Sequence, residues 1–82
     1  MHSLGDRILL LRRHKRLTQK QLADAVGLNS NTIARVERNM VETLRGDTIA
    51  KLARVLGTST DYLLGLSEES GVESELVPTG AL

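Results

Sequence analysis

The chain has 82 residues, which is enough for one small domain with a modest core. It contains no cysteine, which excludes a disulfide framework and a thiolate metal site and fits a reducing cytoplasm. No apolar run approaches the roughly 20 residues of a membrane span, and the start of the chain lacks a secretory pattern. Tyr62 is the one aromatic residue, so the core must be aliphatic.

The formal net charge of +1 hides an asymmetry along the chain. All 11 lysines and arginines lie at or before Arg54, so residues 1–60 carry a net charge of +6 and residues 61–82 carry −5. A basic body suits a polyanionic partner such as nucleic acid. The alternative is a basic surface with no nucleic-acid role, because many small domains reach this charge.

Residues 3–15 are predicted to form a first helix that Ser3 caps. Its apolar stripe is Leu4, Ile8 and Leu11, whereas Leu9 and Leu10 lie off that stripe, so we expect at least one of them to face solvent. The basic residues at the end of this helix suit the helix dipole, which explains them without any nucleic acid. They are Arg12, Arg13, Lys15 and Arg16.

Residues 18–39 are predicted to form two short helices joined by a tight turn. Thr18 and Gln21 have the spacing of a capping box, and Gly27 stands where a left-handed residue ends the helix. Asn29 is expected to cap the second of the two helices, and Asn39 to end it. The apolar residues share a core only if the two helices cross steeply at the turn. They are Leu22, Val26, Leu28, Ile33 and Val36, with Ala23 small enough for close approach.

A fourth helix is predicted over residues 46–56, followed by a stop at Gly57 and a short fifth helix that Ser59 caps. From Ser67 onward the sequence is acidic and shows little periodicity, so we expect a flexible tail. The expected division is therefore a folded domain over residues 1–66 and an acidic tail over 67–82.

The pattern LTQKQLADAVGLNSNTIARVERN, followed by DTIAKLARVLGTSTDYLLG, resembles the phage-repressor and Cro-like helix-turn-helix family, also called the XRE family. The resemblance implies an all-α, compact five-helix, lambda-repressor-like DNA-binding domain. It also implies a cytoplasmic transcription regulator, most often a repressor, that reads a palindromic operator as a homodimer with its third helix. Asn39 stands where the family usually has glycine.

Carried over residue by residue, the resemblance assigns base reading to Ser30, Asn31 and Arg35. It assigns phosphate contacts to Gln19, Arg38 and Asn39, and a structural ion pair to Arg12 and Glu37. The chemistry agrees, because arginine bonds guanine, and asparagine bonds adenine, in a bidentate manner. The alternatives are that Asn31 satisfies local backbone donors at the helix start and that Arg35 is a solvated surface cation.

Two other functions remain open as alternatives. One is an antitoxin-type DNA-binding protein that also binds a toxin through Leu9, Leu10 or the acidic tail, and the other is a protein-interaction module without DNA binding. His2 and His14 have no partner at ligand spacing, so we expect no metal site and no cofactor. The sequence has no recognisable nucleophile motif and no glycine-rich phosphate loop, so we expect no enzyme activity.

Overall fold

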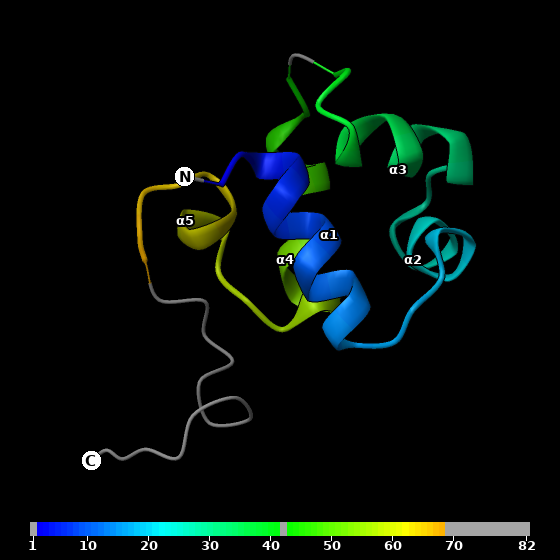
Figure 1. Cartoon of the computed structure of the whole chain (residues 1–82), viewed down its shortest axis with the longest axis horizontal. Helices are drawn as coiled ribbons and strands as arrows, with labels where there is room; N and C mark the ends of the chain where they lie inside the picture. The colour runs from blue at the N-terminus through cyan, green and yellow to red at the C-terminus, as the bar shows by residue number, and fades with distance from the viewer. Residues whose placement is uncertain (1, 42, 69–82) are drawn as a thin grey trace.

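The computed structural model describes residues 2–41 and 43–68, which form five α-helices and no β-strand. Figure 1 shows α2 and α3 at one end of the molecule, α5 at the other end, and α1 and α4 between them. The predicted all-α, five-helix architecture is confirmed. The helices are α1 (Leu4–His14), α2 (Gln19–Val26), α3 (Ser30–Glu37), α4 (Gly46–Leu56) and α5 (Thr60–Leu63).

Helices α1, α2, α3 and α5 begin at the predicted capping residues, whereas α4 follows Arg45 without a side-chain cap. Ser3 accepts a hydrogen bond from the Asp6 backbone while Asp6 accepts one from the Ser3 backbone, and Thr18 and Gln21 form the same reciprocal box before α2. Asn29 caps α3 by accepting from the Thr32 backbone N–H at 2.8 Å. Each of these side chains satisfies a backbone donor that has no partner within its helix, so local sequence sets where the helices start.

The ends of the helices use left-handed residues. Gly27 ends α2 with φ of 76° and Gly57 ends α4 with φ of 73°. Asn39 follows α3 with φ of 60°, as the sequence predicts, and asparagine is one of the few non-glycine residues that adopt this conformation readily. The turn at Gly27 redirects the chain so that α2 and α3 pack against each other.

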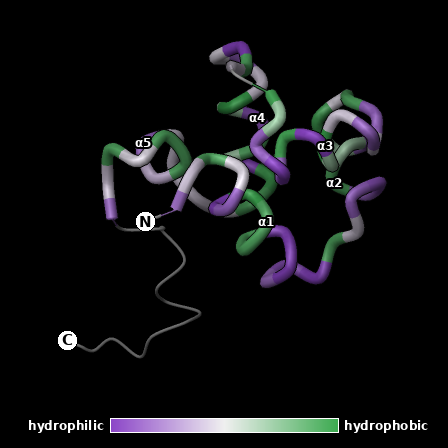
Figure 2. Tube along the Cα trace, turned by 45° about the horizontal axis from the view of Figure 1, so that its top comes forward, coloured by the Kyte–Doolittle hydropathy of each residue, from purple (hydrophilic) through white to green (hydrophobic). Residues whose placement is uncertain are grey.

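A single aliphatic core joins all five helices, and Figure 2 shows hydrophobic and hydrophilic residues alternating along them, as expected of helices with one buried face. The predicted core residues of α2 and α3 are buried. Leu28, in the turn between these helices, is partly buried and packs against the core. Ala23 has no exposed surface, in agreement with its expected place at a close helix crossing. The buried hydrophobic residues are Ile8, Leu11, Leu22, Ala23, Val26, Ile33, Val36, Ile49, Leu52, Ala53, Leu56 and Leu63.

The two leucines that lie off the stripe of α1 stay outside this core. Leu10 is 49% exposed and Leu9 is half-buried. The predicted acidic tail lies almost wholly outside the described residues, which end at Glu68. Among the helices that are described, none is long and apolar enough to cross a membrane.

Candidate nucleic-acid interface

The outward face of α3 presents polar and cationic side chains. Asn31, Arg35 and Arg38 are exposed and follow one another at spacings of four and three residues, so they share one side of the helix. Ser30 is exposed at the start of the same helix. The opposite side is held in the core by buried Ile33 and Val36.

The turn before α3 fixes how this face is presented. Leu28 donates its backbone N–H to the Ala23 carbonyl at 2.9 Å, and this bond closes the end of α2 around Gly27. The Asn29 side chain also accepts from the Thr32 hydroxyl at 3.0 Å. Asn29 therefore satisfies the local backbone donor at the start of α3, the role that was the alternative for Asn31. Asn31 lies exposed in the first turn of α3.

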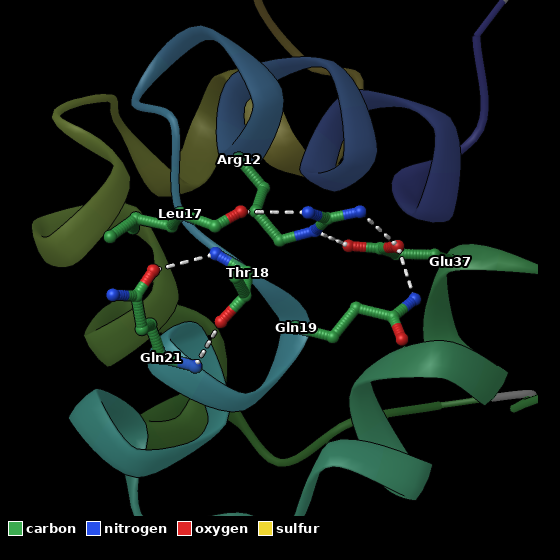
Figure 3. Close-up of polar contacts among 6 residues, drawn as sticks. All are labelled: Arg12, Leu17, Thr18, Gln19, Gln21 and Glu37. Atoms are coloured by element: carbon green, nitrogen blue, oxygen red, sulfur yellow. Dashed lines mark hydrogen bonds and ion pairs between the residues drawn. The ribbon is translucent and has the colours of Figure 1, made fainter.

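A buried polar network joins α1, α2 and α3 behind this face (Figure 3). Arg12 donates to Glu37 from Nε at 2.5 Å and from Nη2 at 3.1 Å, and donates from Nη1 to the Leu17 carbonyl at 2.8 Å. Gln19 donates from Nε2 to the same carboxylate at 3.0 Å. The structure thus brings Arg12 and Glu37 together as an ion pair, and it adds Gln19, a link that the sequence did not reveal.

The charged side chains of this network are largely shielded from solvent. The Glu37 side chain is 4% exposed and that of Arg12 is 12% exposed, so neither charge is well solvated. Three donors surround the carboxylate, which is the compensation that a buried charge requires. Gln19 at the first turn of α2 and Glu37 at the last turn of α3 are thereby joined by a direct hydrogen bond.

Asn39 connects the end of α3 to the start of α1. Its Oδ1 accepts from the Ser3 hydroxyl at 2.7 Å and from the Gly5 backbone at 3.2 Å. A Cβ atom at Gly5 would lie 2.2 Å from the Val36 carbonyl oxygen, so glycine is what permits this approach. Glycine inside a predicted helix was the available signal, since it often marks a close backbone contact.

Arg7 is a second polar residue whose place the sequence did not reveal. It is buried, donates from Nη1 to the Tyr62 carbonyl at 3.1 Å, and lies over the Tyr62 ring at 4.5 Å from the centroid. Its Nε donates to the His2 carbonyl at 3.3 Å. Arg7 therefore fastens the N-terminal segment and α5 to α1, and α5 lies at the opposite end of the molecule from α3 (Figure 1).

The electrostatics of the α3 side favour an anion. Arg35 and Arg38 are both exposed, whereas the one acid of α3, Glu37, is neutralised by its buried arginine. Asp6 lies near the end of α3, and the hydrogen bond from the Ser3 backbone is the main cause that holds the pKa of this carboxyl below its ordinary value. Within the described part of the chain, no group of three or more potential ligands is placed to hold a metal ion.

The comparison with known families and relatives points to one class of protein. A helix-turn-helix family model matches residues 8–63. The HTH-type transcriptional regulator ImmR of Bacillus subtilis (strain 168) is 37% identical over 68 residues, which are 83% of this chain and 53% of ImmR. The chain therefore spans about half the length of this curated relative.

Solved structures of DNA complexes share the fold. The P22 c2 repressor bound to a synthetic operator matches with a TM-score of 0.75 and 30% identity, over 82% of this chain and all of that chain. SinR, a master regulator of biofilm formation solved in complex with DNA, matches with a TM-score of 0.69 and 27% identity, over 73% of this chain and 95% of that chain. The capped helices, the turn at Gly27 and these likenesses agree, and the chain belongs to the XRE family of helix-turn-helix proteins.

Proposed function

We propose that this chain represses transcription by binding a palindromic operator in double-stranded DNA as a homodimer, with α3 of each copy in the major groove. The observation that carries the proposal is the outward face of α3, where exposed polar and cationic side chains stand on a helix whose other side is buried. An α-helix fits the width of the major groove, and such side chains match the hydrogen-bonding groups of base edges.

Base reading is assigned to Ser30, Asn31 and Arg35. These residues lie on the first turns of α3, the part of a recognition helix that reaches base edges. Arg35 supplies the paired donors that suit guanine, and Asn31 supplies the donor and acceptor that suit adenine.

Phosphate contacts are assigned to Gln19, Arg38 and Asn39, which flank this face. The Gln19 amide nitrogen carries two N–H groups, and one is used by Glu37, so the other is the donor offered to a phosphate. Asn39 has its side-chain oxygen occupied by Ser3 and Gly5, which assigns the contact to its amide nitrogen.

The homodimer follows from the limited reach of one recognition helix. A single helix reads only a few base pairs, whereas two copies about one turn of DNA apart read a symmetric site and bind it cooperatively. The relatives with DNA in their solved structures, the P22 c2 repressor and SinR, support a DNA partner for this chain.

The test is selection of binding sites from a random pool of DNA duplexes, followed by titration of variants on the selected site. Arg35→Ala should cost about 1–3 kcal/mol on that site and relax the preference at one position of each half-site. Gln19→Ala should weaken binding with less change in preference. Arg54→Ala is the matched control, because it removes a positive charge from α4 that is also exposed. An unchanged sequence preference in Arg35→Ala, or equal losses in Arg35→Ala and Arg54→Ala, would refute the assignment.

A further inference from the structure

The outer face of α1 carries an apolar centre between two opposite charges. At 3.6 residues per turn, Asp6, Leu9, Leu10 and Arg13 fall on the side of the helix opposite buried Ile8. Leu10 is 49% exposed, Arg13 is exposed, and an open hollow of about 260 Å³ is lined by His2, Asp6, Leu9 and Leu10. The core does not need this face, because α1 already contacts α3, α4 and α5 through its other side.

The order of these residues is self-complementary. When two copies of α1 run antiparallel about a two-fold axis between positions 9 and 10, Asp6 lies opposite the partner's Arg13, and Leu9 lies opposite the partner's Leu10. The axis repeats both contacts, as in any isologous interface. Asp6 and Arg13 are both charged at neutral pH, so the two ends of the face carry opposite charges. The hydrogen bond from the Ser3 backbone lowers the pKa of Asp6 further.

We infer that this face of α1 binds a second copy of the chain, with the leucines of each copy seated against the hollow of the other. The inference rests on the proposed function, since it assigns a surface to the homodimer. A second copy fits better than the acidic segment that follows Glu68, because that segment would bring further carboxylates to Asp6.

The size of the face sets the strength of the association. One pair of 11-residue helices offers a small interface, of the kind that gives weak and transient complexes in solution. Two half-sites on one DNA duplex raise the effective concentration of one copy near the other, so a weak contact is sufficient to favour binding of the pair. The association must therefore be measured by a method that records weak contacts.

Disulfide trapping provides such a method, because the natural chain contains no cysteine. Leu10→Cys in the full chain, with oxidised glutathione and no DNA, should form a covalent dimer at least about tenfold faster than Leu64→Cys. Leu64 is the matched control, since it is 50% exposed and lies at the end of α5. Equal rates for the two variants would overturn the inference.

A charge exchange tests the register of the pair. In an Arg13→Asp homodimer, two carboxylates would meet at each end of the contact, one from each copy. In an Asp6→Arg homodimer, two guanidinium groups would meet there instead. Sedimentation of each variant alone should show loss of association by at least about tenfold, and an equimolar mixture should restore it as a heterodimer. Circular dichroism verifies that both variants are folded. A mixture that associates no better than its components would overturn the inference.

The two proposals fail in different ways. Leu10→Glu should still bind a DNA fragment that carries one half-site, because α3 is unaltered, and should lose at least about tenfold in affinity for the full site. Full-site affinity that is unchanged in this variant would place the dimer contact elsewhere while leaving the DNA-binding proposal intact. The last control uses the Leu10→Cys chain without residues 69–82, to which a peptide of residues 69–82 is added. If this peptide blocks disulfide trapping at position 10, the acidic tail binds the outer face of α1, and the inference is overturned.

Discussion

Replacement of Arg12 by methionine should strongly destabilise the domain, because it strands a buried carboxylate. Glu37 has three donors in the structure, and two of them belong to Arg12. Methionine fills much of the space of arginine without a charge, so Glu37, which is 4% exposed in the structure, would be left with Gln19 as its one donor. The Leu17 carbonyl would lose its arginine donor as well.

The magnitude follows from this burial. Removing one member of a buried ion pair costs about 3–5 kcal/mol, and the lost bond to the Leu17 carbonyl adds about 1 kcal/mol. A domain of this size has a free energy of unfolding of roughly 3–10 kcal/mol. Arg12→Met should therefore lose about two fifths or more of the stability, with a fall in melting temperature of about 12 °C or more.

A double-mutant cycle in urea, followed by circular dichroism, measures this effect. Arg12→Met with Glu37→Met should recover most of the loss, because an apolar pair removes the stranded charge along with its partner. Arg54→Met, at an exposed arginine of α4, should change stability by no more than about 0.5 kcal/mol. The reasoning is refuted if Arg12→Met costs less than about 1 kcal/mol, or if the two methionine substitutions are additive.

Two further predictions concern the contact between α1 and the end of α3. Gly5→Ala should destabilise the domain by about 1–3 kcal/mol, because its Cβ would lie 2.2 Å from the Val36 carbonyl oxygen, and this cost exceeds the gain in helix propensity. Gly46→Ala is the control and should be tolerated, because a Cβ there would have nothing within 4 Å. Equal melting temperatures for the two variants would contradict this prediction. Asp6 has its pKa lowered below 3.8 in the folded chain, so it should contribute stability above that pH and lose it as the pH falls through the folded pKa. Asp6→Asn should therefore flatten the acid limb of the stability profile between about pH 5 and about pH 2, and an unaltered limb would show that this carboxyl does not matter.

The helices of this fold could be predicted from the sequence because their signals are local. Thr18, Asn29 and Gly27 act on backbone groups within a few residues of themselves, and the structure finds each of them in its predicted role. The apolar stripe of α4, which is Ile49, Leu52, Ala53 and Leu56, is likewise a property of one short segment. Local rules are sufficient where a contact spans no more than one or two turns.

The joints between helices could not be predicted in the same way. Gln19 and Glu37 are 18 residues apart, and Asn39 reaches back to Gly5 across 34 residues. Nothing near Arg7 in the sequence indicates that it is buried and contacts Tyr62, 55 positions later. These contacts depend on the packing of the whole core, so periodicity and capping rules do not predict them. The pairing of Arg12 with Glu37 is predicted from resemblance to a family, and from the place of Glu37 next to Val36 at the edge of the core, where a carboxylate needs a partner.

The position of Glu37 links the stability of the domain to its proposed contact with DNA. Glu37 lies in the last turn of α3, behind the exposed Arg38, and holds Gln19 at the first turn of α2 by a bond of 3.0 Å. The same carboxylate that joins α1 to α3 therefore orients the side chain proposed to contact a phosphate. A preorganised donor loses less conformational freedom on binding than a mobile one. A buried ion pair costs desolvation free energy in a small core. An apolar contact at this place would avoid that cost but could not orient Gln19, because methionine at position 37 offers no acceptor to the Gln19 amide.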